Sequence, residues 1–141
     1  MDIARHLALI DELCFRPFPA EHGPSRPGLV KAVLESGHGL CGGDPGERAV
    51  TVEQYEKERD ALCERLAERW GEPALWNLQT VLLRTEREEI PEPWAALSAR
   101  ARVAYLWEAQ GTGRWLALAV ADRDETDEVQ LLVVVTEEAP P

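Results

Sequence analysis

Residues 103–136 read VAYLWEAQGTGRWLALAVADRDETDEVQLLVVVT, and this stretch decides the fold. It contains three runs rich in Val, Leu, Tyr or Trp, at residues 103–110, 114–121 and 128–136. The first two runs are separated by Gly-Thr-Gly, and the second and third by a short charged segment. Apolar runs bounded by such residues are typical of strands joined by turns. We therefore expect three successive strands that form a meander.

A three-residue loop at 111–113 would set the register of the first hairpin. Trp107 would then lie opposite Ala117, with Tyr105 and Trp115 on the same face of the sheet, because side chains alternate along a strand. This register predicts an aromatic ladder paired with alanines. Such a face has shallow hollows that a helix, a second subunit or an apolar ligand could fill.

The predicted strands carry apolar residues on both faces, so both faces need cover. Hydrophobic residues at helical spacing predict helices at about residues 2–14, 28–36, 51–70 and 91–101, and alternation predicts one further strand at 76–85. This order corresponds to an α+β domain. We expect a mainly antiparallel four-stranded sheet, with one strand, a short helix and then the three-stranded meander, packed with the N-terminal helices.

The helix at 51–70 has the clearest signals. Thr51 and Gln54 form a capping-box pattern, and Gly71 follows the last apolar residue. The residues of one helical stripe are predicted to face the sheet; they are Val52, Tyr55, Leu62, Leu66 and Trp70.

The chain has 141 residues, of which 45% are hydrophobic, enough for one core. We expect a single α+β domain over residues 1–141. Proline is frequent in residues 15–28 and glycine in residues 36–50. Both segments are therefore predicted to be long surface loops.

The formal net charge of -11 argues against binding to nucleic acid or to an anionic membrane surface, because both need clustered Lys or Arg. No signal peptide or membrane span is expected from the pattern of apolar residues. The three cysteines, Cys14, Cys41 and Cys63, lack the spacing of a disulfide framework. We expect free thiols in a reducing cytoplasm.

Chemical motifs are weak. His38 and Cys41 could contribute to a metal site or act as base and nucleophile, but a glycine-rich segment holds such groups poorly. The segment that begins at Asp122 resembles a calcium loop at its first and third positions, and departs from it at Asp127 and Val133. We expect no catalytic residue, no metal and no cofactor.

The sequence therefore favours a non-catalytic, cytoplasmic protein-binding or regulatory domain, such as an adaptor, a specialised chaperone or an immunity-type protein. The expected partner is a protein, and the acidity favours a cationic one. A homodimer through a sheet face stays open. The candidate partner-binding residues are Tyr105, Trp107, Trp115, Asp122, Asp124, Asp127 and Glu128.

Two alternatives from other classes remain. The predicted aromatic face of Tyr105, Trp107 and Trp115 could form the pocket of a small-ligand-binding domain. A small enzyme that uses Cys41 and His38 is the third hypothesis.

Overall fold

The computed structural model of the chain describes residues 3–15, 29–37, 45–109, 113–123 and 128–141. In these residues the elements, in chain order, are α1 (Ile3–Phe15), β1 (Leu29–Ser36), α2 (Pro45–Trp70), β2 (Ala74–Asn77), α3 (Leu78–Arg84), α4 (Trp94–Arg100), β3 (Ala101–Ala109), β4 (Arg114–Ala121) and β5 (Gln130–Thr136). The described strands form one antiparallel sheet in the order β1-β5-β4-β3-β2. The predicted α+β class is confirmed, with five described strands in place of the four expected.

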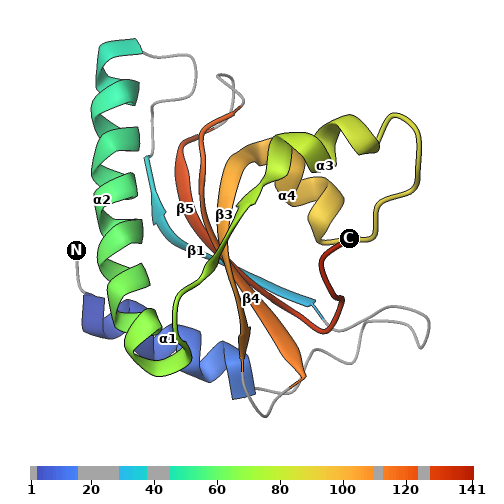
Figure 1. Cartoon of the computed structure of the whole chain (residues 1–141). Helices are drawn as coiled ribbons and strands as arrows, with labels where there is room; N and C mark the ends of the chain where they lie inside the picture. Colours follow the sequence, from blue (N-terminus) through green and yellow to red (C-terminus); the bar gives the residue numbers. More distant parts are fainter. Residues whose placement is uncertain (1–2, 16–28, 38–44, 110–112, 124–127) are drawn as a thin grey trace.

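The helices cover the sheet from two sides. Figure 1 shows α1 and α2 on one side of the sheet and α3 and α4 on the other. The sequence correctly indicated that both faces need cover, since each face belongs to its own apolar cluster.

The meander of β3, β4 and β5 is confirmed, but the predicted register of its first hairpin is wrong by one residue. Trp107 pairs with Leu116, not with Ala117. The connection comprises residues 110–113 because Ala109 pairs with Arg114, so it is one residue longer than the expected loop. A one-residue shift moves a strand's side chains to the opposite face. Trp115 therefore lies on the other face of the sheet from Trp107.

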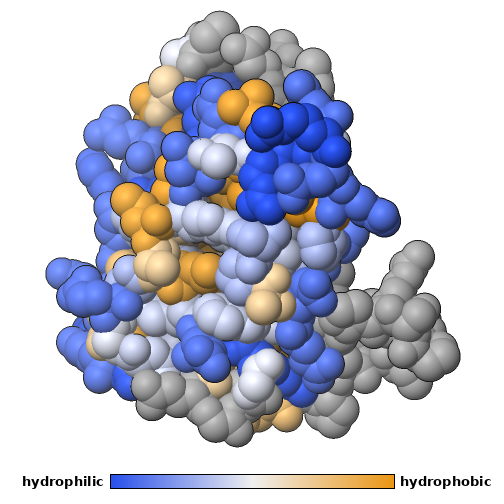
Figure 2. All heavy atoms as spheres, turned by 45° about the vertical axis from the view of Figure 1, so that its right-hand side comes forward, coloured by the Kyte–Doolittle hydropathy of each residue, from blue (hydrophilic) through white to orange (hydrophobic). Residues whose placement is uncertain are grey.

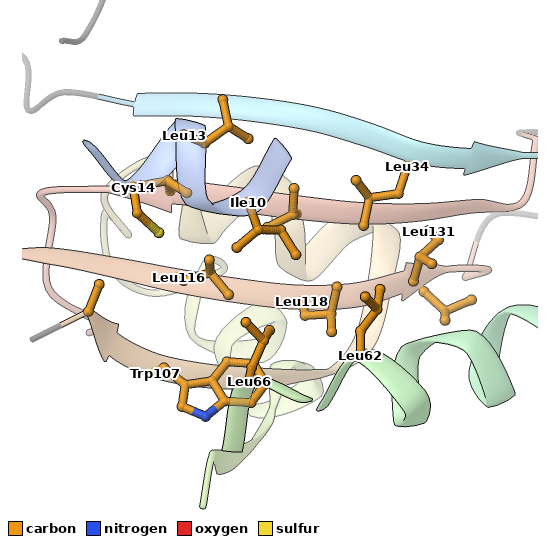
Figure 3. Packing of buried hydrophobic residues seen from close by; sticks show 14 of the residues in the cluster. Ile10, Leu13, Cys14, Leu34, Leu62, Leu66, Trp107, Leu116, Leu118 and Leu131 are labelled. Atoms are coloured by element: carbon orange, nitrogen blue, oxygen red, sulfur yellow. The ribbon is translucent and has the colours of Figure 1, made fainter. Parts of the chain in front are cut away.

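The first face of the sheet packs against α1 and α2. Figure 3 shows Leu62 and Leu66 of α2 directed toward the layer that contains Leu116, Leu118 and Trp107. All five side chains are buried. The predicted stripe of α2 belongs to this cluster, with Val52 and Trp70 partly buried at its margins.

The second face packs against α3 and α4. Small side chains line this face, including Ala104, Ala117 and Ala119, and they allow the helices to approach closely. Trp94 of α4 is fully buried here, and its ring meets that of Trp76 edge-on at a centroid distance of 5.3 Å. The hollows expected beside the alanines are thus filled by the chain's own helices.

Helix α2 is longer than the sequence indicated. It begins at Pro45 instead of Thr51, so part of the surface loop predicted at 36–50 is helical. Residues 16–28 and 38–44, which include most of the loop predicted at 15–28 and part of the loop predicted at 36–50, lie outside the described residues. The predicted end of the helix is confirmed: Gly71 adopts a φ of 84°, and its N–H donates to the carbonyl of Ala67 at 2.9 Å.

Two predicted elements are wrong. Residues 29–36 form strand β1 instead of a helix, because pairing with β5 outweighs the local helical spacing of the apolar residues. The strand expected at 76–85 is short and ends at Asn77, whose side chain caps α3 by accepting from the backbone N–H of Gln79 at 2.9 Å. Leu78 and Val81, three residues apart, then face the core from α3.

Among the helices that the structure describes, none combines the length and the apolar character that a membrane-spanning segment needs.

Candidate protein-binding surface

The predicted aromatic residues do not form one exposed surface. Trp107 is 3% exposed, and its indole N–H donates to the carbonyl of Gly71 at 3.0 Å. Trp115 is partly buried on the opposite face, beside the α3 and α4 cluster. Trp107 is therefore a core residue, and an apolar ligand could reach its face only by displacing α2.

The predicted acidic segment is described only at its two ends. The backbone carbonyl of Asp122 accepts from Arg48 at 3.4 Å, and the carboxylate of Glu128 accepts from the hydroxyl of Ser36 at 2.8 Å. Asp124 and Asp127 lie outside the described residues. Both described acids thus belong to segments that hydrogen bonds hold to other parts of the fold.

Tyr105 is the predicted residue that contacts exposed side chains of α2. Its hydroxyl donates to the carboxylate of Asp60 at 3.2 Å, and the Arg59 guanidinium lies 4.8 Å from the centroid of its ring. Arg59 also forms an ion pair with Asp60 at 3.2 Å. Burial raises the pKa of Tyr105, while the positive charge of Arg59 opposes the shift. The side of α2 that faces β3 is therefore joined to the sheet through polar contacts.

Along the outer side of α2 runs a series of carboxylates at intervals of four residues. It continues from Asp60 through Glu64 and Glu68 to Glu72, just past the helix end. All four are exposed. Residues four apart on a helix are neighbours, and like charges at this spacing destabilise the helix by about 0.2–0.5 kcal/mol per pair. Glu64, Glu68 and Glu72 form no ion pair with any residue that the structure describes.

Strand β2 lies at one edge of the described sheet. Leu75 of β2 pairs with Tyr105 of β3, so the two side chains lie on the same face, toward α2. The exposed fraction of Leu75 is 69%, the largest among the exposed large hydrophobic residues of the described chain. We define the acidic edge as Asp60, Glu64, Glu68, Glu72, Leu75 and Tyr105.

An open hollow of about 630 Å³ lies along this part of α2, and its lining comprises Cys63, Ala67, the carboxylates of Glu64, Glu68 and Glu72, and one basic residue, Arg65. The electrostatics agree with the geometry: burial raises the pKa of the Cys63 thiol, and the nearby charges of Asp60 and Glu72 raise it further. Glu72 therefore lies close to the flank of α2 that carries Cys63.

A smaller hollow of about 100 Å³ lies between α4 and the sheet, with an apolar lining that includes Leu97, Leu132 and Val134. Drug-sized ligands occupy about 300–1,000 Å³. This hollow does not contain the aromatic residues on which the ligand-binding alternative depends.

A group of polar residues that sequence reasoning did not select lies where α1, β1 and α2 meet. His6 and Glu35 form a 3.0 Å contact between Nε2 and Oε1. Glu58 is 8% exposed, and its Oε2 atom has no hydrogen-bond partner among the described residues. The sequence does indicate that Glu58 is buried, because it lies between Tyr55 and Leu62 in the apolar stripe of the helix.

Burial raises the pKa of Glu58, and the negative charge of Glu35 adds to the shift, whereas a hydrogen bond from Gln54 and the charge of His6 oppose it. An acid whose pKa is raised in the folded state makes its full contribution to the free energy of unfolding at pH values below its unfolded-state pKa of about 4.3. That contribution is lost as the pH rises through the folded-state pKa.

Glu58→Gln is therefore expected to raise the melting temperature relative to wild type at pH 8, with a difference that shrinks toward pH 4. Thermal unfolding at both pH values measures the effect, and Glu64→Gln, on the exposed side of the same helix, is the matched control. A Glu58→Gln variant less stable than wild type at pH 8 would show that the ionised carboxylate stabilises the fold.

Of the three cysteines, Cys14 and Cys63 lie in described segments, and both are free thiols. Burial raises the pKa of Cys14 to about 11. No group of three or more His, Cys, Asp or Glu residues in the described part of the chain is arranged to hold a metal ion. His38 and Cys41 lie outside that part.

No protein-family model matches the chain, and no curated protein or solved structure is significantly similar to it. The acidic edge is therefore the feature of the molecule from which a function can be proposed.

Proposed function

We propose that the chain is a non-catalytic, cytoplasmic protein-binding domain of the adaptor, specialised-chaperone or immunity type, and that its acidic edge engages a cationic protein. The observation that carries the proposal is the series of exposed carboxylates along α2 that form no ion pair with described residues, Glu64, Glu68 and Glu72, in a molecule that also exposes Leu75 on β2.

The two components of the surface have different physical roles. A field of one sign attracts a partner of the opposite charge and raises the association rate. A buried apolar contact mainly slows dissociation. The net charge of -11 extends the attraction beyond the acidic edge, which favours basic proteins over nucleic acids and anionic membranes.

A homodimer through a sheet face is less favoured. Helices α1 and α2 cover one face and α3 and α4 cover the other (Figure 1). Figure 2, which brings the α3 and α4 side forward, shows apolar atoms scattered among predominantly hydrophilic ones. Separate apolar groups of this kind are normal for a protein surface.

Reversing three charges, Glu64→Lys with Glu68→Lys and Glu72→Lys, is expected to slow association with the partner by about tenfold or more at low salt. High salt should reduce the difference, because it screens exposed charges. The partner is first captured from a native lysate with the tagged protein and identified, and association rates of the purified pair are then measured by surface plasmon resonance.

The matched control reverses three exposed acids elsewhere, Glu86→Lys, Glu89→Lys and Glu137→Lys, and so changes the net charge equally. We expect it to slow association less than the acidic-edge variant does. Equal rates for both variants and for wild type, at low and at high salt, would contradict the proposal.

A further inference from the structure

The two halves of α1 are held to the fold in different ways. The second half contributes buried apolar side chains to the core, and its Asp11 forms an ion pair with Arg69 of α2. Arg114 of β4 also donates to the carbonyl of Leu13 at 2.9 Å. In the first half, residues 3–9, the apolar side chains are at most partly buried, and His6 is the one buried residue. The attachment of the first half therefore depends largely on the surroundings of His6.

His6 belongs to a cluster of ionisable side chains from α1, β1 and α2. Its Nε2 atom lies 3.0 Å from Oε1 of Glu35 on β1. Glu58 of α2 is 8% exposed, and its Oε2 atom has no hydrogen-bond partner among the described residues. The charges of Glu35 and His6 both act on Glu58, so the three side chains are neighbours. We define the polar cluster as His6, Glu35 and Glu58.

The other ionisable groups around the polar cluster are acidic. Tyr55, one turn before Glu58 on α2, is buried. Burial raises the pKa of its hydroxyl, and the charges of Glu35, Glu58 and Glu128 raise it further. The N-terminal amine precedes the described residues. Among the described residues whose charges act on Glu58, His6 is thus the one that can supply positive charge.

The charge of the polar cluster depends on pH. An imidazole ordinarily loses its proton between pH 5 and 8, and burial raises the pKa of Glu58. With His6 protonated and Glu58 neutral, the charges of His6 and Glu35 balance each other. With His6 neutral and Glu58 ionised, two carboxylates share the site without a positive group, and each disfavours the other. Because buried charges without partners are costly, the packed arrangement is favoured at the acidic end of this range.

We propose that the polar cluster is a pH-sensitive switch, which holds the first half of α1 on β1 and α2 under mildly acidic conditions and releases it under alkaline ones. Release brings water to the carboxylates and exposes little additional apolar surface, because the apolar side chains of residues 3–9 are at most partly buried. An open hollow of about 550 Å³ already lies between α1 and β1 beside His6 and Glu35, and release widens it. The switch does not depend on the acidic edge.

Amide hydrogen exchange of the full-length protein, measured for each residue by NMR spectroscopy, tests the switch. Residues 7–9 lie beyond the first turn of α1, so their amides can donate within the helix. Their rates, corrected for intrinsic exchange, should rise by about tenfold or more between pH 5 and pH 8, because release of one proton shifts an equilibrium about tenfold per pH unit. We expect the rates of residues 12–14, in the second half, to change by about threefold or less.

Two variants of the polar cluster and one control separate the switch from a general effect of pH. Glu58→Gln removes the ionisable group, so the rates of residues 7–9 should differ by about threefold or less between pH 5 and pH 8. Glu64→Gln, on the exposed side of the same helix, should retain the wild-type dependence. His6→Gln retains a donor for Glu35 and loses the positive charge, so it should raise the rates of residues 7–9 at pH 5 by about threefold or more.

The outcomes are distinct. Rates at residues 7–9 that stay constant in the wild type, or that rise equally in Glu58→Gln, would overturn the switch. A parallel rise throughout α1 and α4 would show a global loss of stability and would overturn it as well. The charge reversal on the acidic edge tests the proposed function separately, so failure of one proposal leaves the other in place.

Discussion

Replacing Trp94 with alanine is expected to lower the free energy of unfolding by about 3–5 kcal/mol, as for other fully buried aromatic residues. Trp94 is 0% exposed in the cluster between α4 and the sheet, and its indole N–H donates to the carbonyl of Glu138 at 3.2 Å. The substitution would remove the ring contact with Trp76 and release the C-terminal segment from α4. Equilibrium unfolding in urea measures the loss.

Trp94→Phe is the control for the hydrogen bond. It retains most of the aromatic volume and loses the N–H donor, so we expect a smaller cost, about 1–2 kcal/mol. A denaturation midpoint unchanged by Trp94→Ala would show that α4 does not cover the second face of the sheet.

Leu66→Ala is expected to cost about 2–5 kcal/mol, because Leu66 is fully buried and the substitution leaves a cavity between α2 and the sheet. Figure 3 shows Leu66 directed toward the layer that contains Trp107. Leu83→Ala is the matched control, since Leu83 is 55% exposed and exposed substitutions usually change stability by about 0.5 kcal/mol or less. If both variants unfolded at the wild-type denaturant concentration, α2 would not be packed on the sheet.

The parts of the fold that could be predicted are those in which local pattern and tertiary environment agree. The meander is apolar on both faces and interrupted by turn residues, and the end of α2 coincides with Gly71. In both cases the local sequence is compatible with few other backbone structures. The class of the domain and the need for cover on both faces followed from these elements.

The errors arose where pairing over long sequence distances decides the structure. Residues 29–36 have a local spacing that fits a helix, and only the distant β5 makes them a strand. The register of the first hairpin changes with one residue of loop length. The observed register places Trp115 on the opposite face of the sheet from Tyr105 and Trp107. Asn77 could signal the start of a helix as well as the end of a strand, and its role as a cap is decided by the tertiary structure.

The candidate site was predictable only in part. Acidity pointed to a cationic partner, and Tyr105 does lie at the proposed surface. The exposure of Leu75 could not be derived from its own sequence, because an apolar residue in a short strand usually faces the core. The carboxylates of α2 were visible in the sequence as the polar face of a helix, a pattern that is typical of a solvated surface and does not by itself indicate binding.

The most direct test of the central claim is photo-cross-linking from position 75 in cells that naturally express the protein. A photoreactive amino acid replaces Leu75, and in a parallel variant it replaces the exposed Leu83 as a control. We predict a covalent adduct at position 75 with one protein, whose cross-linked peptide is rich in Lys and Arg, and loss of this adduct when Glu64, Glu68 and Glu72 are changed to Lys. An adduct that forms equally well from both positions, or that persists after the charge reversal, would contradict the claim that the acidic edge binds a cationic partner.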